Sequence, residues 1–361
     1  MPEGPTGGIL SLREDSDGSA VGWRSEGVTR SYLRLARKRT WLLAILLVVT
    51  IGTALLAVTH GAYHLDLASV WWSLVGKPAE GPAGIVVWQI RMPRIAAALV
   101  VGGGLGLAGL SLQALLRNPL GSPSTLGISQ GAAFGAACAI ILFEGRVLSV
   151  SLFAFCGAMG ATLIILSLGR LRRLSPEAVI LAGVALSSLF GAGTILVQYL
   201  SDETRLAQAV VWSFGDVGRS GWREIGLLTL VACLAAVHLA RRRWDLNALE
   251  AGEETARGLG VPVERLRFEG LLAAALVSAL ATAFHGVIAF VGLIAPHMAR
   301  RLVGPDHRFL VPASGVLGSL LLLAADTLGR AVMGSGALPV GVITSFLGAP
   351  LFLGLLIRGT R

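Results

Sequence analysis

Ten apolar runs, each long enough to cross a bilayer as a helix of roughly twenty residues, restrict the fold of this chain more than any other feature. They are residues 41–59, 92–116, 123–143, 147–169, 177–200, 223–240, 266–284, 287–303, 309–329 and 338–357. Only 14% of the 361 residues are charged, whereas soluble proteins carry about 25%. The sequence therefore predicts an all-α polytopic membrane protein with ten transmembrane helices.

The distribution of Lys and Arg predicts the orientation. With the N-terminus inside, 22 of the 30 basic residues fall in inner segments, and the outer side keeps Lys77, Arg91, Arg94, Arg146, Arg205, Arg219, Arg223 and Arg330. Basic residues concentrate on the cytoplasmic side of membrane proteins, and an even number of spans returns the chain to its starting side. Both termini are thus predicted to be cytoplasmic. The net charge of +9 reflects this topology and does not indicate nucleic-acid binding.

Residues 1–40 are polar, contain Gly and Ser, and end in the basic run RLARKR. This composition is typical of a disordered segment. It is too long for the n-region of a signal peptide, so residues 41–59 are interpreted as an uncleaved first span. The prediction is a disordered cytoplasmic tail over 1–40, followed by a ten-helix domain over 41–361.

The sequence argues against chemistry within this chain. No GxxxxGK[ST] pattern occurs, so a P-loop for ATP is excluded. Residues 104–109 fit GxGxxG, but they lie inside an apolar run and no acidic residue follows before Glu144, which favours close helix packing over dinucleotide binding. The three cysteines lie in apolar runs without metal-ligand spacing. We expect no catalytic site, no cofactor and no resident metal.

The inner segment 244–262, WDLNALEAGEETARGLGVP, predicts a short helix. Asn247 is its expected N-cap with Glu250 in the first turn. One face is expected to carry Leu246, Leu249, Ala256 and Leu259. The polar face is mainly acidic, whereas helices that lie on membranes carry Lys and Arg there. The pattern favours docking into the groove of a partner, with a membrane-surface helix as the alternative.

Six segments then carry a family resemblance. They are WQIRMPRIAAALVVGG, QALLRNPLGSPSTLGISQGAAFGA, LNALEAGEETARGLGV, AFVGLIAPHMARRLVGPDHRFLVP, LLLAADTLGR and LPVGVITSFLGAPLFLGLL. Together, over about residues 40–358, they closely resemble the permease family of ABC importers for iron–siderophore, haem and cobalamin. The resemblance implies a type II ABC importer permease that works as a dimer of two permease copies. It also implies two cytoplasmic ATP-binding subunits and an extracytoplasmic substrate-binding protein as partners.

The resemblance assigns roles to two inner segments. It implies that the residues that couple the permease to the ATPase are Gly252, Glu253, Glu254, Ala256, Arg257 and Gly260. In the loop RNPLGSP, Asn118 and Leu120 match residues that close the cytoplasmic end of the pathway. The alternative for Asn118 is a helix cap beside a proline turn. A second gate loop reads Leu174-Ser175-Pro176-Glu177 and lacks the Ser/Thr pair of the cobalamin importers, so no gate residue is assigned there.

At the outer side, Arg91 and Arg94 match an RxPR motif and Arg330 matches an AD…R motif. The resemblance implies that these arginines receive acidic residues of the binding protein. Nothing nearby in sequence neutralises Arg91 and Arg94, while Asp326 lies one helical turn before Arg330. The alternative is that the side chains reach lipid phosphates. His285 is a candidate contact for cargo in the pathway, with an ordinary helix-end histidine as the alternative.

These features predict a multi-pass permease of a bacterial or archaeal cytoplasmic membrane that imports a metal chelate, with a ferric siderophore as the first expectation. Haem or cobalamin is the alternative cargo. A secondary carrier for an amphiphilic solute and a membrane scaffold are the alternatives from other classes. Asp326 is the only acidic residue well inside a predicted span, which disfavours an ion-driven carrier. Lipid is an expected partner and nucleic acid is not.

Overall fold

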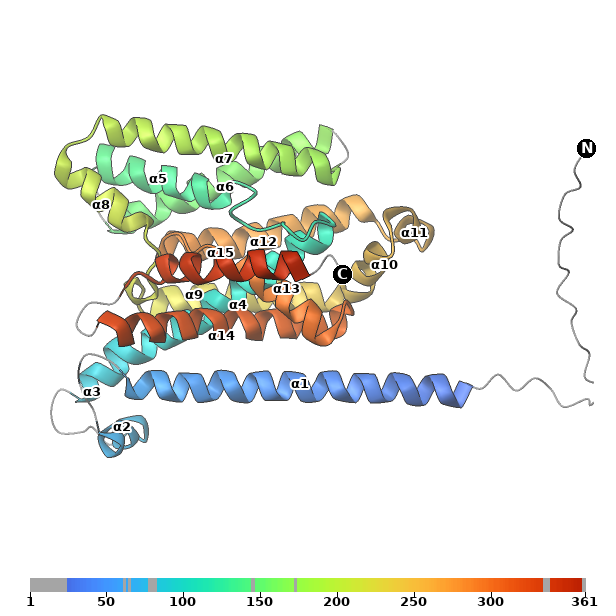
Figure 1. Ribbon diagram of the computed structural model, residues 1–361. Helices are drawn as coiled ribbons and strands as arrows, with labels where there is room; N and C mark the ends of the chain where they lie inside the picture. Colours follow the sequence, from blue (N-terminus) through green and yellow to red (C-terminus); the bar gives the residue numbers. More distant parts are fainter. Residues whose placement is uncertain are drawn as a thin grey trace, which may run out of the picture.

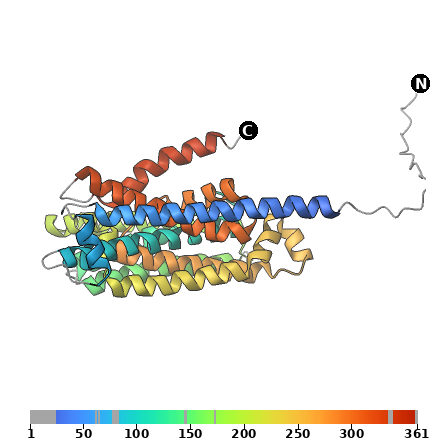
Figure 2. The same cartoon turned by 90° about the horizontal axis from the view of Figure 1, so that it is seen from below.

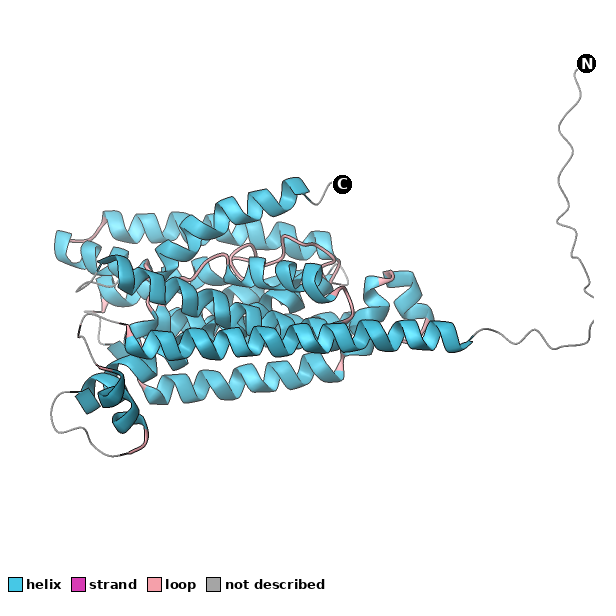
Figure 3. Ribbon diagram, turned by 60° about the horizontal axis from the view of Figure 1, so that its bottom comes forward, coloured by secondary structure: helices cyan, strands magenta, loops and turns pink. Residues whose placement is uncertain are grey.

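The computed structural model describes residues 25–60, 63, 66–76, 83–143, 147–171, 174–333 and 338–358. Each of the ten predicted runs contains one helix of a side-by-side bundle (Figure 1). These helices are α1 (Ser25–Thr59), α4 (Met92–Leu115), α5 (Ile128–Leu142), α6 (Val147–Leu171), α7 (Pro176–Tyr199), α9 (Trp222–Arg241), α12 (Val263–His285), α13 (Val291–Val303), α14 (His307–Met333) and α15 (Val340–Arg358). Figure 3 shows helices connected by loops throughout this described part. The predicted all-helical membrane fold is confirmed.

Shorter elements occupy the two ends of the bundle (Figures 1 and 2). One end carries α2 (Leu67–Leu74), α3 (Ala83–Ile85), the π-helical turn η1 (Val86–Arg91), α8 (Glu203–Ser213) and the 3-10 turn η2 (Val217–Arg219). The other carries α10 (Arg243–Glu250) and α11 (Glu253–Gly258). We call them the α2/α8 end and the α10/α11 end. The start of α1 and the end of α15 both lie toward the α10/α11 end (Figure 1), as ten crossings require.

Helix α4 lies at the centre of the packing and is buried along most of its length. Its glycines allow this, because a Cβ on Gly102 would collide with the backbone of Gly318 in α14, and one on Gly109 with the backbone of Gly292 in α13. The GxGxxG stretch is therefore a helix-packing surface. This confirms the interpretation made from its apolar context.

Three helices are shorter than the span that a bilayer requires. Helices α5 and α13 have 15 and 13 residues, and the strongly apolar part of α15 is also short. A helix of 15 residues rises only about 22 Å, against a hydrocarbon core of about 30 Å. Irregular stretches, residues 116–127 and 286–290, precede α5 and α13. Many of their residues are buried, which is where non-helical backbone is tolerated at membrane depth.

The start of the chain differs from the sequence prediction. Residues 25–40 were predicted to belong to a disordered tail, but they are helical and continuous with the first span in α1. The reason is that this stretch contains several Arg and Leu residues, which are good helix formers, and extending an existing helix needs no new nucleus. Residues 1–24, the rest of the predicted tail, lie outside the described residues.

Candidate coupling and gating site

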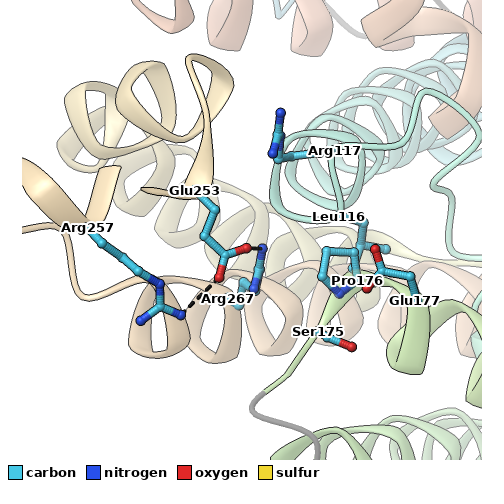
Figure 4. Close-up of a pocket in the computed structure, with 8 residues that line it drawn as sticks. All are labelled: Leu116, Arg117, Ser175, Pro176, Glu177, Glu253, Arg257 and Arg267. Atoms are coloured by element: carbon cyan, nitrogen blue, oxygen red, sulfur yellow. Dashed lines mark hydrogen bonds and ion pairs between the residues drawn. The ribbon is translucent and has the colours of Figure 1, made fainter. Parts of the chain in front are cut away.

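A polar pocket of about 550 Å³ lies at the α10/α11 end (Figure 4). It is lined by Leu116, Arg117, Ser175, Pro176, Glu177, Glu253, Arg257 and Arg267. These residues come from the end of α4 and the first residue of the RNPLGSP loop, from Ser175 and the first turn of α7, from the short helix α11 and from the first turns of α12. The structure thus brings together three segments that the sequence analysis singled out separately, and adds Arg267, which it had not considered.

The inner segment forms two helices instead of the single helix that was predicted. Gly252 separates α10 from α11 and has φ +131°, a backbone conformation that L side chains rarely adopt. Leu246, Leu249 and Ala256 are buried as predicted. Leu259 is not, with 69% of its surface exposed, and it follows the last residue of α11 as its C-cap.

Asn247 is not the predicted N-cap, since α10 begins four residues earlier. Its amide instead reaches the loop between α13 and α14. The Asn247 Oδ1 accepts a hydrogen bond from the backbone N–H of His307 (2.9 Å), and its Nδ2 donates to Asp306 (3.1 Å). Glu250 pairs with Arg300 of α13 at 2.5 Å. Helix α10 is therefore attached to α13 and α14 through side chains as well as through its buried leucines.

Helix α11 holds the acidic and basic residues of the predicted coupling set in two different environments. Glu253 points inward, where its carboxylate accepts from Arg267 (2.5 Å) and from Arg257 (2.9 Å). These hydrogen bonds, that from Arg267 first, lower the pKa of Glu253 below its ordinary value. Arg257 also pairs with Glu264 at 2.6 Å. Glu254 and Gly260 are exposed, Gly252 is half-buried and Ala256 is buried. Glu254 therefore offers the exposed carboxylate of this helix.

The RNPLGSP loop begins with Arg117 at φ +47°, unusual for a residue other than glycine. The Asn118 side chain accepts a hydrogen bond from the backbone N–H of Leu120 (2.8 Å), a local turn typical of Asn. Leu120 is 45% exposed. The Asn118 side chain therefore forms a turn within the loop, and neither the gate role nor the helix-cap alternative is decided by it.

The loop before α7 is similarly well defined. Leu174 has φ +53°, and Ser175 caps α7 by accepting a hydrogen bond from the backbone N–H of Ala178 (3.3 Å). Pro176 occupies the first position of the helix, where its missing N–H costs nothing. Glu177 follows in the first turn and faces the pocket together with Arg117 (Figure 4).

Two of the three arginines predicted to receive the binding protein at the opposite end, Arg94 and Arg330, have carboxylate partners inside the protein. The buried carboxylate of Asp326 accepts from Arg94 Nε at 2.8 Å and from Arg330 Nε at 3.1 Å. Arg94 also pairs with Asp216 at 3.1 Å. Both partners of Arg94 are distant in sequence, and Asp326 reaches it because α4 and α14 pack side by side.

Arg91 has no carboxylate partner among the described residues, yet it is only 3% exposed. Its guanidinium donates to the carbonyls of Val58, Thr59 and Tyr63 at and after the end of α1. Arg330 donates to two further carbonyls there, those of Ala57 and His60. The last carbonyls of a helix lack intrahelical donors and favour cations. Burial of Arg91 thus follows from how α1 ends.

His285 was a candidate contact in the pathway, but the structure buries it completely. Its Nδ1 lies 3.1 Å from the carbonyl oxygen of Ala281 and its Nε2 lies 2.6 Å from Ser220 Oγ. It therefore joins the end of α12 to the segment before α9, the helix-end role given as the alternative. The described residues contain no cluster of three or more His, Cys, Asp or Glu side chains that could hold a metal.

Comparison with known proteins identifies relatives over nearly the whole chain. Residues 45–358 match the model of the FecCD transport family. A protein of Methanocaldococcus jannaschii, provisionally named as an ABC transporter permease, is 46% identical over 92% of this chain and 98% of its own length. The hemin transport system permease of Yersinia pestis and the vitamin B12 import system permease of Vibrio cholerae are each 36% identical, over 87% of this chain and 93% of theirs.

A solved structure shows the same fold. It is an inward-facing conformation of a transporter provisionally described as of the metal-chelate ABC type, and it superposes with a TM-score of 0.77 at 31% identity. The match covers 89% of this chain and 99% of the other.

Proposed function

The chain belongs to the FecCD transport family, and we propose that it is the membrane-spanning permease subunit of an ABC importer. The observation that carries this proposal is the extent of the match, which includes all ten helices and leaves out little more than the N-terminal segment. The chain has no P-loop of its own, so the ATP-hydrolysing site belongs to a separate subunit. The secondary-carrier and scaffold alternatives are not favoured by this membership.

We propose that the permease works as a dimer, with two ATP-binding subunits at the α10/α11 end and a substrate-binding protein at the α2/α8 end. The α10/α11 end is then cytoplasmic, as the distribution of basic residues predicts. Helix α11 with Gly252, Glu253, Glu254, Ala256, Arg257 and Gly260 is the proposed coupling element. Its exposed Glu254 supports this assignment, because it is available to a partner, whereas Glu253 is already engaged by two arginines.

The proposed cargo is a metal chelate, in the first place a ferric siderophore, with haem or cobalamin as alternatives. Two relatives of equal identity are named for hemin and for vitamin B12, so overall similarity does not separate these cargoes. A pre-formed chelate suits the structure, since it would cross without needing ligands from the protein. The described residues offer no metal-ligating cluster.

We further propose that Asn118 and Leu120 close the pathway at the α10/α11 end. The exposure of Leu120 in the RNPLGSP loop supports this proposal. At the α2/α8 end, Arg91, Arg94 and Arg330 are proposed to act in docking by shaping the surface and its charge. Arg94 and Arg330 pair there with the carboxylates of Asp216 and Asp326, whereas Arg91 donates to backbone carbonyls. One net positive charge is left to attract an acidic partner.

The test of coupling is Glu254→Arg in complexes of the permease with its ATP-binding subunits in vesicles. We expect a lower affinity between the subunits and less cargo moved per ATP, since like charges across an interface are repulsive. The matched control is Glu203→Arg, an exposed glutamate on α8 at the other end, which should leave subunit affinity unchanged. Normal affinity and transport in Glu254→Arg would rule out this surface as the coupling site.

A second measurement separates an ABC importer from a secondary carrier. Uptake into the same vesicles should require ATP and be stopped by vanadate, while ionophores that collapse ion gradients leave it intact. The opposite pattern would overturn the proposed transport class. Comparison of candidate chelates in this assay would then decide the cargo.

A further inference from the structure

One buried arginine connects the three segments around the α10/α11 pocket. Arg267, in α12, has only 1% of its surface exposed and is among the largest fully buried side chains. Its Nε donates to the carbonyl of Leu115 (3.2 Å), its Nη1 to the carbonyl of Leu174 (3.4 Å) and its Nη2 to the carboxylate of Glu253 (2.5 Å). A single guanidinium thus touches the end of α4, the loop before α7 and the start of α11.

Each of these three acceptors has a physical reason to need a cation. Leu115 is the last residue of α4, so its carbonyl has no intrahelical donor and lies at the negative end of the helix dipole. Leu174 adopts a positive φ before α7, which takes its carbonyl out of any regular hydrogen-bond pattern. Glu253 is a partly buried carboxylate. Without Arg267, its charge would be partly removed from water and would lose a compensating partner.

The geometry points to more than charge neutralisation. A guanidinium is planar and its donors are held in a rigid fork, so acceptors bound to its three nitrogens keep fixed positions relative to one another. Leu115 lies two residues before the first residue of the RNPLGSP loop, and Leu174 lies in the loop before α7. A displacement of Glu253 is therefore passed to the beginnings of both loops through one side chain.

Other contacts of the inner helices lead elsewhere. Asn247 and Glu250 attach α10 to α13 and α14, while Arg257 joins α11 to Glu264 at the surface of α12. Beside Arg267, the pocket of about 550 Å³ is lined by α11 residues, by Arg117 of the RNPLGSP loop and by Glu177 in the first turn of α7 (Figure 4).

We propose that Arg267 is the positioning residue that transmits movement of α11 to both loops, so that the two halves of the cytoplasmic gate respond together. The inference rests on the proposed function, in which α11 contacts the ATP-binding subunit. It adds Arg267 as the residue through which the contact of α11 with the ATP-binding subunit would reach the two gate loops.

The experiment uses the full-length permease assembled with its ATP-binding subunits, in a background without Cys138, Cys156 and Cys233. Spin labels are attached in separate samples to cysteines replacing Thr255 on α11, Leu120 on the first loop and Glu177 on the second. Distances between the two labels of the dimer are measured without nucleotide, with ATP and after vanadate trapping. Transport per ATP is measured on the unlabelled proteins.

In Arg267→Gln, the Thr255 labels should still respond to nucleotide, while the responses at Leu120 and Glu177 should be lost. Transport per ATP should fall roughly tenfold, within the range typical of coupling between sites, with the ATPase rate largely kept. Arg267→Lys should restore part of the response, because it keeps the charge without the fork. The matched control is Arg265→Gln, two residues away with a side chain 72% exposed, which should behave as the unmodified protein.

A purely structural role would lower ATPase activity and transport together and leave their ratio unchanged, which would overturn the proposal. Unchanged responses at both loops in Arg267→Gln would overturn it as well. Should this variant fail to fold, Glu253→Gln carries the test, since it weakens the α11 contact and leaves both carbonyl contacts in place. If the Thr255 labels do not respond even in the unmodified protein, α11 is not the coupling element and both proposals fall.

Discussion

The two ends of the bundle both bury arginine, but they surround it differently. At the α2/α8 end, Arg94 and Arg330 share the buried carboxylate of Asp326, and Arg91 is enclosed by backbone carbonyls at the end of α1. These partners belong mostly to long helices that pack along one another. At the α10/α11 end, Arg267 binds a six-residue helix, the loop before α7 and the last residue of α4 beside a pocket.

The difference shows that burial alone does not reveal what an arginine does. A charge whose partners are all on packed helices can only hold them in place. Arg267 instead connects the end of α4 with a short helix and a loop next to free volume, so it can pass movement between them. We call Arg91, Arg94, Arg330 and Asp326 the α2/α8 cluster and regard it as a fixed framework. We call Arg267, Glu253 and Arg257 the α10/α11 cluster and regard it as movable. Four predictions test this contrast.

The largest effect is expected for Asp326→Asn. This change leaves Arg94 and Arg330 without their shared carboxylate inside the protein, and removing one partner of a buried ion pair costs about 3–5 kcal/mol. Denaturant unfolding of the purified permease in detergent should show this loss. Asp202→Asn, an exposed aspartate at the same end, is the control and should change little. A loss no larger than the control's would mean that the framework is not held by Asp326.

Gly252→Ala should have an intermediate effect. A residue with a side chain at φ +131° is strained, at a cost of about 1–3 kcal/mol, although nothing crowds the position apart from Thr255 Oγ1 at 3.5 Å. The same unfolding assay measures the loss of stability in Gly252→Ala. A binding assay measures its affinity for the ATP-binding subunit. Gly258→Ala, where no positive φ is required, is the matched control. Equal behaviour of the two variants would show that the break between α10 and α11 does not depend on this backbone conformation.

Arg257→Gln should destabilise the protein by less than about 1 kcal/mol, because it removes ion pairs at the surface, which are screened by water. Of its two partners, Glu253 keeps its hydrogen bond to Arg267, and Glu264 remains accessible to solvent. Unfolding curves of this variant and of Asp326→Asn, recorded side by side, compare the two ends directly. Similar losses would mean that the α10/α11 cluster is as rigid as the framework.

The smallest effect concerns pH. The pKa of Glu253 is lowered, first by its hydrogen bond to Arg267, so its ionised form stabilises the folded state at neutral pH. This contribution is complete above the ordinary pKa of 4.5 and is lost as the pH falls below it. The stability difference between the unmodified protein and Glu253→Gln should therefore be present at pH 7 and shrink below pH 4.5. A difference that does not change with pH would show that Glu253 is not held ionised by Arg267.

The spans were predictable because each one is a local run of apolar residues, and lipid demands that such a run satisfy its own backbone hydrogen bonds. The helix boundaries were less predictable. The third run was expected to begin at residue 123, but α5 begins at Ile128, since the preceding irregular stretch is buried by neighbouring helices. Composition does not distinguish apolar residues that face lipid from those that face protein.

Contacts between residues close in sequence were predictable, whereas contacts between distant residues were not. The pair Asp326–Arg330 is four residues apart on one helix, a spacing that sequence alone reveals. Arg94 and Asp326 are 232 positions apart, and Arg267 and Leu115 are 152 apart. No pattern along the chain connects such residues, so Arg267 passed unnoticed among the inner basic residues.

Local physics in the amino-acid sequence accounts for the ten crossings, the absence of an ATP site and the short acidic segment that becomes α10 and α11. Those properties depend on runs of neighbouring residues and on the thickness of the bilayer. The burial of Arg91, the sharing of Asp326 and the position of Arg267 between α4, α11 and the loop before α7 depend instead on which helices pack together. Charges inside a membrane protein need partners, and only the folded arrangement of the helices selects them.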